Sequence, residues 1–162
     1  MSHPTEPQRI LIVRLSALGD VVHALPLLDA LRRARPDAHI GWLVEEAAAS
    51  LLDDHPQLDQ VWVAPRREIK GLVKQRRYGA AWGRLQETRR ALRDARYDIT
   101  LDVQCNLRSG FWAWSSGAAR RIGFAPPFSK EGSRRFATEL VTVTGEPQQK
   151  VLRDLEILRP LG

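Results

Sequence analysis

The sequence contains a single cysteine and no long apolar run. Cys105 can neither form an internal disulfide nor supply a thiolate cluster for zinc, as expected of a protein in a reducing compartment. No apolar stretch approaches the roughly 18 residues that a membrane-spanning helix needs. Residues 1–8 form a polar tail without the pattern of a secretory signal. These absences predict a cytoplasmic protein and argue against redox and structural-zinc functions.

Familiar motifs for phosphates and metals are also missing. The sequence lacks both the G-x-G-x-x-G and the G-x-x-x-x-G-K-[ST] patterns, so ordinary dinucleotide and P-loop functions are not expected. No Asp-x-Asp occurs, which removes the simplest carboxylate pair for a metal-bound diphosphate. The histidines share no metal-ligand spacing. We therefore expect no metal site and no bound cofactor.

Length and charge describe what is present. The chain has 162 residues, 43% of them hydrophobic, which is enough for one folded domain with a sizeable core. It carries 25 Lys and Arg against 19 Asp and Glu, a formal net charge of +6. Such an excess suits nucleic acids, phosphorylated sugars, anionic lipid headgroups and nucleotides alike. The positions of the basic residues must decide between these ligands.

Hydrophobic periodicity predicts strands that alternate with helices. Residues 9–15, RILIVRL, are typical of a strand buried on both faces. The further expected strands are 39–44, 60–64, 98–103 and 121–124, and the expected helices are 20–35 with a kink at Pro26, 45–52, part of 66–96, 107–116 and 148–158. This order predicts a Rossmann-like α/β domain, a parallel sheet with helices on both faces. Residues 65–79 and 126–145 are expected to be irregular.

Polar residues directly after the strands are the candidate site, because ligands bind beyond the carboxyl ends of parallel strands. The candidates are Arg14, Ser16, Gly19 and Asp20 after the first strand, Arg66, Arg67 and Lys70 after the third, and Gln104 and Arg108 after the fourth. Gly19 can bring the helix start close to an anion. Asp20 should be ionised near neutral pH because the helix dipole stabilises a carboxylate there.

Each candidate also has a purely structural interpretation. Asp20 is equally typical of a helix N-cap, and three basic residues within five positions are often only a solvated loop. Asp102 interrupts a buried strand and should need a polar partner, either in a core network or in the wall of a site. The residues alone leave these alternatives open.

Several segments together resemble the bacterial lipopolysaccharide heptosyltransferases of glycosyltransferase family 9. They are ILIVRLSALGDVVHALPLLDALRRARP, WLVEE, RREIK and YDITLDVQCNLRSG, in that order, and the likeness spans residues 9–162. The most specific piece is the S-x-x-G-D-V-x-H-x-L-P signature at residues 16–26. Family members have two Rossmann-like domains facing across a cleft, the GT-B fold. The resemblance implies that this chain is the N-terminal, acceptor-binding domain and that the C-terminal domain, which binds most of the ADP-heptose donor, lies outside it.

The resemblance also implies roles for particular residues. Asp20 would be the general base that deprotonates a hydroxyl of Kdo on lipid A as that oxygen attacks the heptose anomeric carbon with inversion. The other candidate residues, with Lys130 added, would bind the anionic acceptor at the membrane surface without a metal. Cys105 stands where the family usually has Gly, Lys150 where it has His, and Lys130–Glu131 replaces an Arg–Glu pair. Such replacements bear on acceptor specificity.

Two other functions compete with this one. A family 9 transferase with a different acceptor sugar would differ only in substrate. A basic Rossmann-like module that binds nucleic acid is supported by the net charge alone, because no nucleic-acid motif is present and the basic residues are dispersed over several helices.

Overall fold

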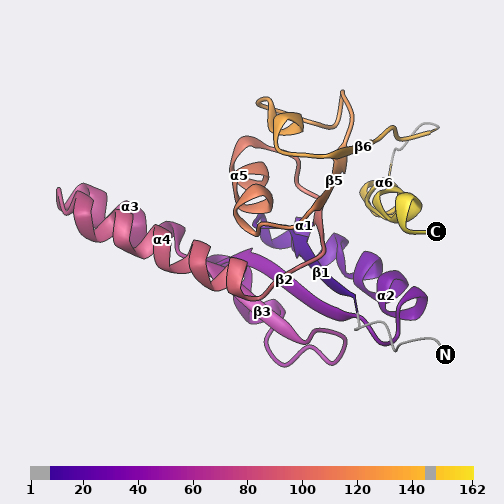
Figure 1. Ribbon diagram of the computed structural model, residues 1–162, viewed down its shortest axis with the longest axis horizontal. Coiled ribbons are helices and arrows are strands. Elements are labelled where there is room, and N and C mark those ends of the chain that lie inside the picture. Colours follow the sequence, from indigo (N-terminus) through magenta and orange to yellow (C-terminus); the bar gives the residue numbers. More distant parts are fainter. Residues whose placement is uncertain (1–7, 145–148) are drawn as a thin grey trace.

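The computed structural model describes residues 8–144 and 149–162 and contains a six-stranded parallel sheet with the strand order β3-β2-β1-β4-β5-β6 (Figure 1). The strands are β1 (Arg9–Val13), β2 (His39–Glu45), β3 (Gln60–Ala64), β4 (Ile99–Asp102), β5 (Arg120–Phe124) and β6 (Glu139–Val141). The helices are α1 (Leu18–His23), α2 (Leu25–Ala34), α3 (Arg66–Lys74), α4 (Tyr78–Asp94), α5 (Leu107–Ser115) and α6 (Lys150–Leu155), with 3₁₀ turns at Glu46–Leu51, Ser133–Arg135 and Glu156–Leu161. The predicted α/β fold is confirmed.

Helices cover both faces of the sheet, and each face has its own core. On one face, Ile10 and Ile12 of β1 pack with buried residues of α1 and α2 and with Ile157 after α6. On the other face, Leu11 and Val13 pack with α4 and α5. Successive side chains of a strand point to opposite faces, so an uninterrupted apolar run is the pattern that serves two cores.

The structure corrects several predicted boundaries. The helix expected at 20–35 is two helices separated at Ala24, and the second carries Pro26 in its first turn, where a missing N–H costs no hydrogen bond. Residues 66–74, expected to be irregular, form α3. The segment 126–145, also expected to be irregular, contains the short edge strand β6 and a 3₁₀ turn. Gln148, the expected start of the last helix, lies outside the described residues.

Helices α3 and α4 form an antiparallel hairpin that projects from the body of the protein (Figure 1). The polypeptide turns between them at residues 75–77, where Arg76 adopts a left-handed conformation with φ of 59°. The hairpin begins at the carboxyl end of β3 and returns to the sheet before β4. Among the described residues, no helix is long and apolar enough to cross a bilayer.

A close contact of Gly41 with Tyr97 provides a test of the packing under β2. A Cβ atom at Gly41 would lie 2.7 Å from Tyr97 Cζ and closer still to the hydroxyl oxygen, which accepts a 2.7 Å hydrogen bond from the Trp62 indole. We expect Gly41→Ala to displace Tyr97 and to lower the free energy of unfolding by about 1–3 kcal/mol. Urea unfolding followed by circular dichroism measures this change.

Gly83→Ala is the matched control, because a Cβ atom at Gly83 would meet nothing within 4 Å. Alanine favours a helix over glycine by up to about 1 kcal/mol, so this variant should be unchanged or more stable. Equal stability of Gly41→Ala and the wild type would contradict the close packing of Gly41 against Tyr97.

Candidate functional site

A cavity of about 560 Å³ opens at the carboxyl ends of β1 and β4. The chain passes from β1 outward to β2 and β3 and then crosses back to β4 on the other side of β1. This reversal of direction is where open α/β sheets place their ligands. The lining residues are Arg14, Ser16, Ala17, Asp20, Val103, Gln104, Asn106, Phe124, Pro127, Phe128, Lys130, Lys150 and Arg153.

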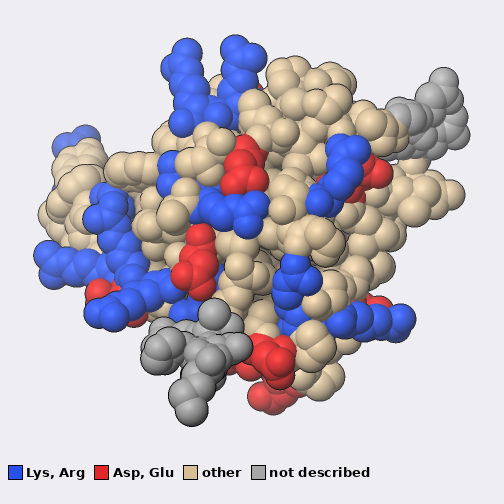
Figure 2. All heavy atoms as spheres, turned by 45° about the vertical axis from the view of Figure 1, so that its right-hand side comes forward, with Lys and Arg blue, Asp and Glu red and all other residues tan. Residues whose placement is uncertain are grey.

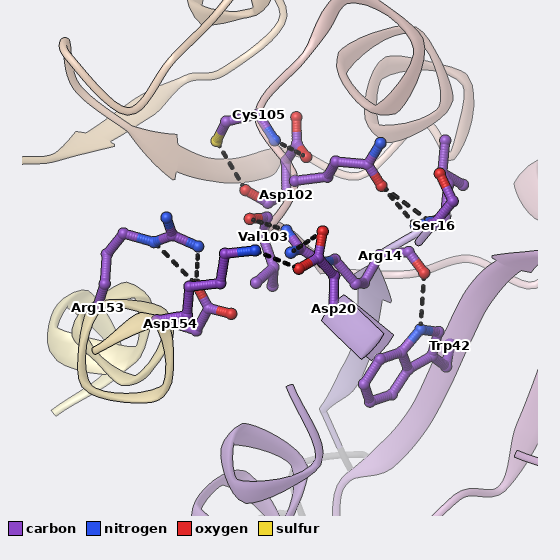
Figure 3. Close-up of polar contacts among 12 residues, drawn as sticks. Arg14, Ser16, Asp20, Trp42, Asp102, Val103, Cys105, Arg153 and Asp154 are labelled. Carbon is purple, nitrogen blue, oxygen red and sulfur yellow. Dashed lines mark hydrogen bonds and ion pairs between the residues drawn. The ribbon is translucent and has the colours of Figure 1, made fainter. Parts of the chain in front are cut away.

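Asp20 lies in the wall of this cavity with a cation on each carboxylate oxygen. Lys150 donates a hydrogen bond to Oδ1, and Arg14 Nη2 lies 3.2 Å from Oδ2 (Figure 3). Partial burial opposes ionisation, but the Lys150 hydrogen bond and the charges of Arg14 and Lys150 outweigh it and hold the pKa of Asp20 below its ordinary value. Asp20 is therefore ionised at neutral pH and can accept a proton.

Asp20 does not cap its helix. It is the third residue of α1, and the N-cap position belongs to Ala17, which has no side-chain capping bond. The structural interpretation of Asp20 as an N-cap is therefore wrong. A carboxylate in the first turn still benefits from the helix dipole, and here it faces the cavity.

Arg14 connects the elements that surround the cavity. Its guanidinium is buried and donates a 3.0 Å hydrogen bond to the carbonyl of Val103, beyond β4, while its own carbonyl accepts one from the Trp42 indole in β2 (Figure 3). A buried guanidinium requires several partners to offset its lost hydration. Arg14 therefore holds Asp20 in place more than it contacts a ligand.

Gln104 is a second positioning residue. Its side-chain oxygen accepts hydrogen bonds from the backbone N–H groups of Leu15, at 2.8 Å, and Ser16, at 3.1 Å. These two bonds tie the loop after β1 to the end of β4. Both Gln104 and Ser16, which are candidates from the sequence, line the cavity.

Asp102 belongs to a buried network at the end of β4. Its Oδ1 accepts a 2.8 Å hydrogen bond from the backbone N–H of Cys105. Burial raises the pKa of Asp102 to about 6, against the opposing effect of hydrogen bonds from Cys105, Ser109 and Gln104. Asp102 does not line the cavity, so of its two alternatives the core network is the one observed.

Cys105 occupies a backbone conformation that favours glycine. Its φ is 52°, in the left-handed region, which gives a physical reason for the glycine that the related family usually has at this position. The thiol is buried, donates to the carbonyl of Asp102 at 2.9 Å and accepts from the N–H of Phe124 at 3.1 Å. Burial raises the pKa of the Cys105 thiol, so the side chain is structural and unreactive.

Arg66, Arg67 and Lys70 line a second cavity, of about 290 Å³, at the start of α3. The sequence placed them in one candidate site with Asp20, whereas the structure shows them in a cavity that Asp20 does not line. The buried carboxylate of Glu45, at the end of β2, explains the arrangement: its Oε2 lies 3.1 Å from Arg66 Nη1, and its Oε1 accepts a hydrogen bond from Arg108. Glu45 thus fixes two of the basic candidates.

Two predicted residues line neither of these two cavities. Gly19 is exposed, and a Cβ atom there would meet nothing within 4 Å. Arg108 is engaged by Glu45 and lies on α5, whose start is set by a capping box between Asn106 and Ser109. Lys130, the candidate added by the family resemblance, lines the first cavity.

The sequence interpretation missed two contributors to the site, Glu45 and Arg153. Glu45 was visible only as part of the WLVEE segment. Arg153 lines the first cavity and lies over the rings of Phe124 and Phe128. It also pairs with the buried Asp154 (Figure 3). Cation–π contacts join residues distant in sequence, so no local pattern announces them. Within the described part of the chain, no three His, Cys, Asp or Glu residues come close enough to hold a metal ion.

Comparison with known proteins assigns the chain to a family. No family model matches it, but lipopolysaccharide heptosyltransferase 1 of Pseudomonas aeruginosa is 38% identical over 119 residues, 73% of this chain and 31% of that protein. The Escherichia coli K12 protein of the same name is 34% identical over 107 residues, 62% of this chain and 31% of that protein. The chain belongs to the lipopolysaccharide heptosyltransferase family. It spans about a third of the length of these curated relatives.

Solved structures of heptosyltransferases share the fold. The E. coli heptosyltransferase WaaC with ADP-2-deoxy-2-fluoro heptose superposes with a TM-score of 0.82 at 24% identity, over 94% of this chain and 48% of that one. A glycosyl transferase family 9 protein of Veillonella parvula superposes with a TM-score of 0.72 at 25% identity, over 98% of this chain and 42% of that one. E. coli ADP-heptose lps heptosyltransferase II superposes with a TM-score of 0.66 at 17% identity, over 93% of this chain and 40% of that one. The predicted likeness to part of a GT-B glycosyltransferase is confirmed.

The raised pKa of Asp102 predicts a pH dependence of stability. The folded protein binds a proton at Asp102 up to about pH 6, whereas the ordinary value is 3.8. This contribution to stability is therefore complete below the ordinary value and is lost as the pH rises to about 6. Relative to Asp102→Asn, the wild type should lose up to roughly 3 kcal/mol of unfolding free energy between pH 4 and 7. Urea unfolding at both pH values measures this, and a difference independent of pH would contradict the assignment.

The Lys150 hydrogen bond predicts a change in the acidity of Asp20. Lys150→Met removes a hydrogen bond and a positive charge from the carboxylate, so the pKa of Asp20 should rise. A carbon-13 NMR titration of labelled aspartate measures the shift. Lys130→Met is the control, because it removes the same charge from the same cavity without a hydrogen bond to Asp20. Equal shifts in the two variants would show that the Lys150 contact is unimportant.

Proposed function

We propose that this chain is the acceptor-binding part of an inverting heptosyltransferase of the heptosyltransferase I type. The reaction transfers L-glycero-D-manno-heptose from ADP-heptose to Kdo of lipid A at the cytoplasmic face of the inner membrane. The observation that carries the proposal is an ionised Asp20 in the wall of a cavity at the reversal point of a sheet whose sequence and fold relatives are heptosyltransferases. Because those relatives are much longer, the donor is assigned to a portion beyond this chain.

In this proposal Asp20 is the general base. The Kdo hydroxyl enters the first cavity, its oxygen attacks the anomeric carbon of the heptose, and its proton passes to the Asp20 carboxylate. The bond from the anomeric carbon to the diphosphate breaks, and ADP leaves with the electron pair. Lys150, whose side chain is half exposed, can move away from Oδ1, while the buried Arg14 keeps the carboxylate oriented. The Asp20 carboxylate therefore keeps its position while its Oδ1 becomes free to accept the proton.

Basic side chains around the two cavities suit an acceptor with several negative charges. Lys130, Lys150 and Arg153 line the first cavity, where a Kdo carboxylate would lie beside the reacting hydroxyl. Arg66, Arg67 and Lys70 line the second, which would take a further carboxylate or a lipid A phosphate. We propose that the reaction needs no metal ion, since lysine and arginine supply the positive charge on this side of the cleft.

Nucleic-acid binding is the weaker alternative. On the face shown in Figure 2, basic side chains are interspersed with acidic ones and form no continuous basic field. Double-stranded nucleic acid is bound by aligned basic residues that replace counterions along the backbone. A transferase with a different acceptor sugar would use the same base and differ only in the cavity contacts.

Asp20→Asn tests the proposal in a transferase that contains this chain together with a donor-binding portion. The amide keeps the size of the side chain but cannot take a proton, so kcat should fall by about 10²–10⁴. Calorimetry of this chain with deacylated Kdo-lipid A should show an acceptor affinity within a few-fold of the wild type. Radiolabelled heptose transfer measures kcat.

Asp29→Asn is the matched control, because Asp29 lies on α2, pairs with Arg33 and lines neither cavity. Its kcat should equal that of the wild type. Near-normal transfer by Asp20→Asn would exclude the general-base role. Steeply salt-dependent binding of an oligonucleotide, unaffected by Kdo sugars, would favour the nucleic-acid alternative.

A further inference from the structure

The tip of the α3–α4 hairpin has a surface that the proposed reaction does not use. We define the tip as residues 73–82, which comprise the end of α3, the turn and the first residues of α4. Every residue from 73 to 80 is exposed. In Figure 1 the tip is the part of the hairpin farthest from the sheet. Its composition is therefore not explained by packing in this chain.

Charges of one sign gather on this part of the hairpin. Between Glu68 and Glu87 the charged residues are Lys70, Lys74, Arg76, Arg77 and Arg84, all of them basic. Arg84 is neutralised by Glu68, at 2.8 Å, and by Glu87, at 3.0 Å. Within residues 8–144 and 149–162, the other four form no salt bridge. The tip is thus a concentrated positive charge that points into solvent.

Large apolar side chains are exposed beside these cations. Val73 is 45% exposed, Tyr78 63% and Trp82 61%. Tyr78 and Trp82 are four residues apart, so they project from the same face of α4. Exposed aromatic and aliphatic groups cost hydration free energy unless a partner covers them. This combination of cations and exposed apolar groups suits a partner that is both anionic and apolar.

We propose that the tip binds the surface of an anionic lipid bilayer. Headgroups attract lysine and arginine, while tryptophan, tyrosine and valine enter the boundary between headgroups and acyl chains. The choice of a bilayer rests on the proposed function, because a lipid-linked acceptor is presented from a membrane. Arg66, Lys70 and Lys74 follow one another at four-residue spacing, which places a basic stripe along α3 from the second cavity to the tip.

A single-stranded nucleic acid fits the tip less well. Such strands are held in positively charged grooves where bases stack on aromatic rings. The tip is a projection, and its exposed Val73 has no role in stacking or in phosphate contacts. A lipid surface accommodates a projecting element with a mixed basic and apolar end.

Sedimentation with vesicles tests the docking surface directly. The full 162-residue chain is mixed with vesicles of phosphatidylcholine alone or with an equal share of phosphatidylglycerol, without donor or acceptor sugar. We expect binding to the anionic vesicles that weakens with added salt. The triple variant Lys74→Gln, Arg76→Gln, Arg77→Gln should bind about a hundredfold more weakly. The double variant Tyr78→Ser, Trp82→Ser should bind about tenfold more weakly.

Control variants remove the same groups elsewhere. The first control is the triple variant Arg33→Gln, Arg134→Gln, Arg135→Gln, which removes three exposed basic residues outside the hairpin. It should change vesicle binding by less than about threefold, because salt screens charges beyond roughly 8–10 Å. Trp114→Ser, Leu140→Ser removes two exposed apolar residues outside the hairpin and should leave binding unchanged. Thermal unfolding by circular dichroism verifies that each variant is folded.

The possible results separate this proposal from the proposed function. Equal binding to both vesicle types, or equal losses in tip and control variants, would overturn the docking surface while leaving Asp20 catalysis intact. Oligonucleotide binding that the tip substitutions abolish, with no vesicle binding, would assign the tip to nucleic acid and also overturn the proposal. Vesicle binding lost only in the tip variants supports it, even if the transferase assay fails.

Discussion

A buried guanidinium at the end of β1 holds the candidate site together. Arg14 is attached by its backbone to Trp42 of β2, by its side chain to the carbonyl of Val103 after β4, and by charge to Asp20 of α1. Its Nε is buried without a hydrogen-bond partner among the described residues, so the contacts of the guanidinium with the Val103 carbonyl and with Asp20 are the ones that offset its desolvation. Removing any one of them would leave a poorly compensated buried charge. The position of the carboxylate therefore depends on three parts of the sheet at once.

Two carboxylates near the carboxyl ends of the strands each position two basic side chains without cancelling their combined positive charge. Glu45 engages Arg66 and Arg108, and Asp20 engages Arg14 and Lys150. In both cases one carboxylate faces two cations, and each group of three side chains keeps a positive charge. The carboxylates thus order the basic side chains while the cavities stay attractive to anions. Order matters because long basic side chains otherwise lose rotamer entropy when a ligand binds.

Sequence reasoning found most of the sheet and missed elements whose signals are short or contradictory. The run RILIVRL is typical of a buried strand, and β1 is paired with β2 along its whole length and with β4 over Ile10–Val13. In contrast, α3 was expected to be irregular, although it has Ile69, Leu72 and Val73 at helical spacing, because Gly71 and the charged residues among them weaken that signal. The edge strand β6 has three residues, too few for any periodicity to be read. Its register comes entirely from pairing with β5.

By itself, the sequence determined the alternation of strands and helices, the polar ends of the strands and the likeness to a heptosyltransferase, because these are written in contiguous residues. Only the tertiary structure decided which of those polar ends meet. Lys150, 130 positions along the chain from Asp20, forms a hydrogen bond with it. Arg66 and Arg108 pair with Glu45 and not with Asp20. Electrostatic contacts depend on distance in space, and local patterns carry no record of that distance.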